Sequence, residues 1–121
     1  MASQQVGSYA FLAGTVIAIL VGLLIGAGQA AVLGGIGPWI PLVLIILGVV
    51  VGVLNIGDKE VDKFLIASIA LLALAGSAGG LITIPAVGTY LVAIVQNIAV
   101  FVAPAALIVA LKAIKGLAEA Q

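Results

Sequence analysis

The sequence predicts an all-α integral membrane protein, a bundle of four transmembrane helices arranged as two helical hairpins. Composition is the first observation, because hydrophobic residues make up 65% of the 121 residues and charged residues only 7%, against about 25% charged in a typical soluble domain. The mean hydropathy of +1.50 is the second. The third is a series of four apolar stretches, each long enough or nearly long enough to cross the hydrocarbon core of a bilayer. We therefore expect one transmembrane domain.

The inventory of reactive side chains excludes several classes of function. The chain has no Cys and no His, and its net charge is zero. Disulfides, thiolate chemistry, zinc sites and an imidazole base are therefore absent. A neutral chain without a basic patch is a poor partner for nucleic acid. We expect no cofactor, no metal site and no enzymatic activity.

The first apolar stretch is predicted to be a span over residues 6–31. Small residues recur in it at every fourth position, namely Gly14, Ala18, Gly22, Gly26 and Ala30. This spacing places small side chains in one groove, so that another helix backbone can approach closely. The alternative is that Gly and Ala are simply abundant in membrane helices.

A cleaved signal peptide is the other interpretation of this stretch, since residues 28–30 resemble a cleavage site. The first five residues contain no basic residue, however, and the apolar run exceeds the usual length of about 7–15 residues. We expect the stretch to be retained as a span.

The second span is predicted over residues 39–55, after a loop rich in glycine and proline at residues 32–38. Trp39 stands at its start, where an aromatic ring can anchor a helix at the membrane interface. Gly48 and Gly52 form a four-residue pair that favours close helix packing.

Residues 57–63 form a charged turn between the two predicted hairpins. Five of these seven residues are charged, and more than forty uncharged residues lie on either side. Asp58 is placed to cap the third helix, with further acids in the first turn where the helix dipole favours them. A pair of catalytic carboxylates would need a pocket. The simpler interpretation is an exposed, nearly neutral turn.

The third and fourth spans are predicted over residues 64–84 and 89–111. Gly76 and Gly80 form a small-residue pair in the third. The fourth carries a heptad seam that is suited to close packing, and its residues are Gln96, Ala99, Ala103, Ala106, Ala110 and Ala113. Pro104 lies beside that seam and is expected to kink the helix.

Four spans place both termini and the charged turn on the same face of the membrane. The chain's four lysines then share that face, and they are Lys59, Lys63, Lys112 and Lys115. The positive-inside rule makes this face cytoplasmic. We therefore expect a multi-pass protein of the cell membrane with both termini in the cytoplasm.

Gln96 and Asn97 are the strongly polar side chains predicted to lie deep in a span. They could form a ligand or water site, or they could act as hydrogen-bonding contacts between helices, which are worth about 0.6 kcal/mol on average in membranes. Neighbouring helical positions point about 100° apart, so the two amides cannot both serve one narrow seam.

Two segments carry a resemblance to a known group of proteins. They are residues 53–60 with 64–67 (VLNIGDKE and FLIA) and residues 97–114 (NIAVFVAPAALIVALKAI). Together they resemble small four-span membrane proteins of DPANN archaea, over about a quarter of the chain. The resemblance implies an origin and a span count, and no activity. The two glycine-rich hairpins are also similar to the proteolipid subunit of rotary ATPases, but Gln96 stands where that family needs a carboxylate.

The first functional hypothesis is a structural or scaffolding protein that self-associates in the membrane, with lipid as its surroundings and further copies of itself as partners. Small-residue faces on all four predicted helices motivate it, because one bundle is unlikely to bury them all. The alternatives are a channel or carrier for a small neutral solute, with Gln96 and Asn97 at its constriction, and an accessory subunit of a larger membrane complex.

Overall fold

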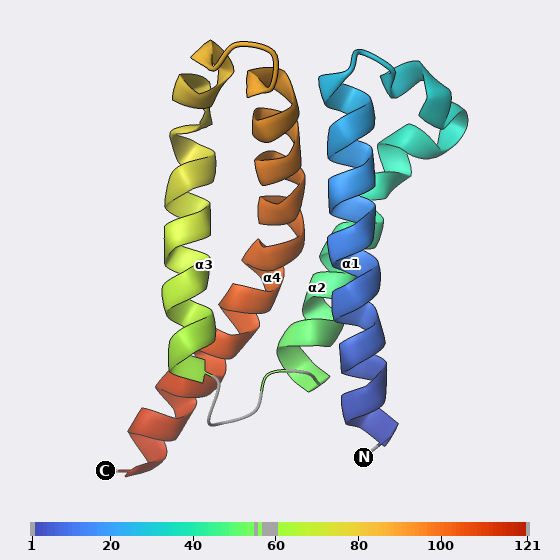
Figure 1. Cartoon of the computed structure of the whole chain (residues 1–121). Coiled ribbons are helices and arrows are strands. Elements are labelled where there is room, and N and C mark those ends of the chain that lie inside the picture. The colour runs from blue at the N-terminus through green and yellow to red at the C-terminus, as the bar shows by residue number, and fades with distance from the viewer. Residues whose placement is uncertain (1, 55, 57–60, 121) are drawn as a thin grey trace.

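The computed structural model describes residues 2–54, 56 and 61–120, and every element in these ranges is helical. The predicted all-α class is confirmed. Figure 1 shows four α-helices side by side, with successive helices running in opposite directions. Both chain ends lie at the end of the molecule where α2 ends and α3 begins. Expectations for residues 57–60, including the cap at Asp58, concern residues outside the described ranges.

Helix α1 spans Ala2–Gly26 and ends earlier than the predicted 6–31. The cause is Gly28, whose φ of +76° lies in the left-handed region. The Gly28 N–H donates to the Ile25 carbonyl at 3.0 Å, and the Gln29 N–H donates to the Leu24 carbonyl at 2.8 Å. This pair of bonds is a Schellman motif, which terminates the helix and satisfies its last carbonyls.

The predicted loop at 32–38 is instead a 3₁₀ helix, η1, over Ala30–Trp39. It is interrupted at Gly34, whose φ of 56° and ψ of −136° are not helical. A residue with a side chain would be strained in this conformation. Helix α2 follows directly as Ile40–Leu54, close to the predicted 39–55.

Helix α3 spans Val61–Gly76 and is followed by a second 3₁₀ segment, η3, over Ala78–Thr83. The predicted span of 64–84 is therefore divided at Ser77. Glycine has a low helix propensity, and Gly76, Gly79 and Gly80 all lie near this change. After a turn, α4 spans Gly88–Ala120, and the predicted span of 89–111 lies within it.

Helix α4 is the centre of the fold. It packs against α1, α2 and α3, and α1 also packs against α2. Within the described ranges, α3 packs against α4 and its own continuation η3, and none of its Cα atoms lies within 8 Å of a Cα atom of α1 or α2. Figure 1 shows α3 on one side of α4 and the α1–α2 pair on the other. The buried core accordingly lies where α1, α2 and α4 meet.

Three helical stretches are long and apolar enough to cross a membrane, judged by length and composition. They are Gln5–Gly26, Ala30–Leu54 and Gly88–Glu119. Large apolar side chains are exposed along all three, including Leu12, Ile46 and Leu107. Monomeric soluble proteins rarely expose an apolar surface of this extent. The fold is that of a helical membrane protein.

Candidate functional site

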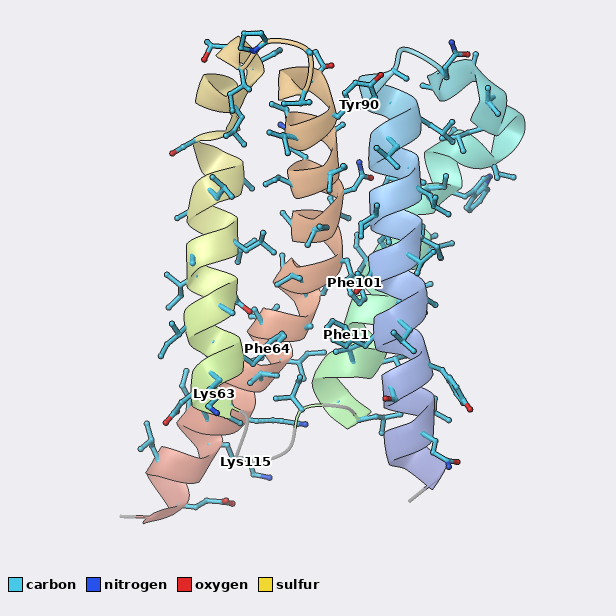
Figure 2. All side chains as sticks on the ribbon, viewed as in Figure 1. Phe11, Lys63, Phe64, Tyr90, Phe101 and Lys115 are labelled. Atoms are coloured by element: carbon cyan, nitrogen blue, oxygen red, sulfur yellow. The ribbon has the colours of Figure 1, made fainter. Side chains whose placement is uncertain are left out.

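Phe101 of α4 is the side chain around which the helices pack. It is 2% exposed, and its ring stacks on that of Phe11 from α1, with centroids 6.2 Å apart and planes inclined by 18°. Figure 2 shows the two rings meeting between α1 and α4. A methyl group at Gly14 would overlap the Phe101 ring. Gly14 therefore provides the space that this ring fills.

The small-residue stripe of α1 lies along α4 as far as Gly26. A Cβ atom at Gly22 would stand 2.6 Å from the Ile94 Cα, and one at Gly26 would stand 2.7 Å from the Tyr90 Cα. Carbon atoms normally pack at about 3.5–4.0 Å, so these glycines allow backbone to meet backbone. Ala18, one turn before Gly22, is fully buried. Ala30 differs from expectation, since it lies beyond the helix in η1 and is exposed.

The glycine pair of α2 also faces α4. A Cβ at Gly48 would overlap the Phe101 carbonyl oxygen and stand 2.7 Å from the Pro104 Cγ. A Cβ at Gly52 would stand 3.0 Å from the Ala105 carbonyl oxygen. Glycines from α1 and α2 therefore approach α4 from two directions, and α4 is held between them.

The buried stripe of α4 differs from the predicted heptad seam. Ala93, Phe101, Ala105 and Val109 are buried and Asn97 is half-buried, so this stripe repeats every fourth residue. It matches the four-residue repeat of α1, and rows of equal spacing interdigitate well. In the predicted seam, Ala99, Ala106 and Ala110 are half-buried and Ala103 is exposed. Those alanines lie beside the buried stripe of α4.

The glycines at the end of α3 and in η3 differ from those of α1 and α2. Around Gly76, Gly79 and Gly80, apart from the adjacent residues and the backbone of the same helix, no atom of the described structure lies within 4 Å of the position that a Cβ would take. The predicted packing at Gly76 and Gly80 is therefore not made within one chain. Their face of the molecule is open.

Pro104 lies halfway along α4, and Figure 1 shows this helix changing direction near its middle. Proline has no N–H to donate and its ring displaces the preceding turn. The Pro104 ring also lies against α2 beside Gly48.

The two polar residues predicted in the fourth span do not converge. Gln96 is exposed on the surface of α4. The Asn97 side-chain amide donates to the Ala93 carbonyl of its own helix at 2.8 Å. Ser68 of α3, which is 3% exposed, likewise donates to the Phe64 carbonyl at 2.7 Å. These bonds satisfy the polar groups locally.

Lys112 has a structural contact that its sequence position does not reveal. Its Nζ donates to the Gly52 carbonyl at 2.9 Å and to the Val53 carbonyl at 3.0 Å. These carbonyls belong to the last turn of α2, where helical acceptors lack partners and a cation is favoured. The two residues are about sixty positions apart, so no local pattern could have indicated the bond. Lys63 and Lys115 are exposed at the same end of the bundle (Figure 2), and Lys59 is outside the described residues.

Cavities open on the surface of the bundle. One, about 550 Å³, lies between α1, η1 and α2 and has an entirely apolar lining that includes Leu20, Trp39 and Val43. A second, about 330 Å³, contains Asp62 and Lys112. The third, about 270 Å³, lies between α1 and α3 over α4. In the described part of the chain, no group of acidic residues is placed to hold a metal ion.

Comparison of the chain with known protein families, with curated proteins and with solved structures gives no match.

The contrast between Gly48 and Gly76 predicts opposite effects of the same substitution. Gly48→Ala should lower the free energy of unfolding by about 1–3 kcal/mol, because the new methyl group forces α2 away from α4. Gly76→Ala should leave stability unchanged or raise it by up to about 1 kcal/mol, because alanine favours the helix and meets no neighbour. Unfolding in mixed micelles, followed by circular dichroism, measures both. Equal destabilisation by the two variants would contradict the packing described here.

The bonds of Lys112 predict a difference between neighbouring lysines. Lys112→Met should lower the free energy of unfolding by about 1 kcal/mol, since two carbonyls of α2 lose a charged donor near the surface. Lys115→Met is the matched control and should have a smaller effect. The same micelle unfolding experiment compares them, and an equal loss from both would show that charge alone matters.

Proposed function

We propose that this protein is a structural component of a cell membrane, a four-span helical protein that associates with further copies of itself and performs no catalysis. The proposal is supported by one contrast: some glycines lie against another helix of the same chain, and others do not. A Cβ atom added at Gly14, Gly22 or Gly48 would collide with atoms of α4. A Cβ atom added at Gly76, Gly79 or Gly80 would meet no atom of another element within 4 Å. Small residues on an exposed membrane helix are typical of surfaces where helices from separate chains meet.

The length of the third helical segment supports four spans. Helix α3 has 16 residues, which correspond to about 24 Å. The six residues of η3 add about 12 Å at the rise of a 3₁₀ helix. Together they are comparable with the hydrocarbon thickness of about 30 Å. Helix α3 also runs alongside α4 in Figure 1, as a span would.

The distribution of lysines supports a cytoplasmic location for both termini. Lys63 and Lys115 lie at the end of the bundle that holds the N- and C-termini (Figure 2). Lys112 reaches the last turn of α2 at that end. Lysine-rich ends of membrane bundles face the cytoplasm.

The alternative of a channel or carrier is less well supported, because the two amides proposed for its constriction point to different surroundings. Gln96 is exposed, and Asn97 bonds to its own helix. The alternative of an accessory subunit remains compatible with the open face of α3, since another membrane subunit could cover it.

The topology predicts which positions a membrane-impermeant maleimide can reach. The sequence has no cysteine, so single cysteines can be introduced without a background signal. In intact cells Val87→Cys, in the turn before α4, should be labelled, and Ala118→Cys should react only after lysis. Labelling of both positions, or of Ala118→Cys alone, would contradict the proposed orientation.

Self-association predicts a homo-oligomer in both mild detergent and lipid nanodiscs, measured by native mass spectrometry. The open small-residue face of α3 is the physical reason, because lipid cannot pack against backbone as closely as another helix can. A strictly monomeric protein in every condition would overturn the proposal. Stoichiometric recovery of a different chain from native membranes would favour the accessory subunit.

A further inference from the structure

The last turns of α4 extend beyond the end of α2. Helix α4 has 33 residues, which correspond to about 50 Å, whereas the hydrocarbon core of a bilayer is about 30 Å thick. Lys112 lies at the level where α2 ends, because its Nζ bonds to the Gly52 and Val53 carbonyls. Residues 113–120 add about 12 Å of helix beyond that level. We call residues 111–120 the terminal segment of α4.

The terminal segment is amphipathic. Its large apolar side chains recur at every third position and cover an arc of about 120° around the helix axis. They are Leu111, Ile114 and Leu117, which are 56%, 61% and 69% exposed. Its charged side chains lie within a separate arc of about 60°, and they are Lys112, Lys115 and Glu119. Side chains 114–119 are all exposed, so no other described element covers either side.

The direction of the terminal segment turns its apolar side toward the layer in which the bundle lies. Beyond Pro104, α4 slants past the start of α3 and away from α1 and α2 (Figure 1). It passes close to the first turn of α3, since Val61 and Gly116 line one cavity. Figure 2 shows the Lys115 side chain directed away from the body of the bundle. Leu117 is two positions further on and therefore about 160° away around the axis, so it faces back toward the bundle layer.

The membrane surface is the surrounding that fits this arrangement. In water the apolar side would stay exposed, and a helix of fewer than about 12–15 residues gains little stability there by itself. A protein partner usually contributes about 20–30 residues to an interface, against three large apolar residues here. A helix with Leu and Ile on one side and Lys on the other is typical of segments that lie in the interfacial layer of a bilayer.

We propose that the terminal segment of α4 lies in the headgroup layer of the adjacent leaflet and binds phospholipid there. Ile114 and Leu117 reach the boundary with the acyl chains, and Lys115 stays on the aqueous side. The bonds of Lys112 to α2 hold the helix where the segment begins, and so set the depth of the bundle in the membrane. This inference requires that α4 spans a membrane. It depends neither on self-association nor on which face is cytoplasmic.

Spin labels on single cysteines in phosphatidylcholine nanodiscs test this placement, and the absence of native cysteine makes each label specific. Leu117→Cys is the test variant. Glu119→Cys is its matched control, because the two positions are about 160° apart around the helix. Electron paramagnetic resonance compares the accessibility of each label to oxygen, which concentrates among acyl chains, and to a nickel chelate, which stays in water. The ratio of oxygen to nickel accessibility should be higher at Leu117→Cys than at Glu119→Cys, and Ile114→Cys should resemble Leu117→Cys.

Two other results would overturn the proposal. High nickel accessibility at both Leu117→Cys and Glu119→Cys would show that the terminal segment projects into water. Low accessibility of Leu117→Cys to both reagents would show that protein covers it. Native mass spectrometry of the same samples reports self-association separately, so a failed membrane contact is distinguished from a failed oligomer. Unchanged circular dichroism confirms that each variant is folded.

Discussion

Close approach of backbone to backbone at α4 is the constraint on which the rest of this structure depends. Between helices in lipid there is no hydrophobic driving force, so association relies on van der Waals contact and on hydrogen bonds. Gly22 and Gly48 maximise that contact because neither carries a side chain that would hold α4 at a distance. The Phe101 ring then occupies the space left by Gly14. The three-helix core of α1, α2 and α4 follows from these complementary shapes.

The second constraint is electrostatic and acts at one end of the bundle. The last carbonyls of α2 have no partners within their own helix, and Lys112 supplies two hydrogen bonds to them. The bond joins the first hairpin to the second at the end where both termini lie. Lys112 thus stabilises the tertiary contact between α2 and α4, and in the proposed orientation the same charge also lies on the cytoplasmic side.

The position of α3 sets what the protein can do beyond folding. Because α3 packs on α4 without reaching α1 or α2, the bundle is left open along one side. Lipid or another protein chain must cover this side. Under the proposed function, the contacts that one chain does not make are available to a second copy.

The sequence by itself determined the helical class, the close-packing glycines of α1 and α2, and the position of the second helix. These features depend on hydropathy and on local spacing, which the residues carry directly. Tertiary structure decided the rest. It selected the four-residue row through Phe101 instead of the alanine seam through Ala103, because a row on α4 is buried only where a partner has the same spacing. It also placed the Phe101 ring against Gly14 and no other helix against Gly76, although both are glycines in apolar helices. The difference arises because a helix face is a packing site only when another helix lies against it.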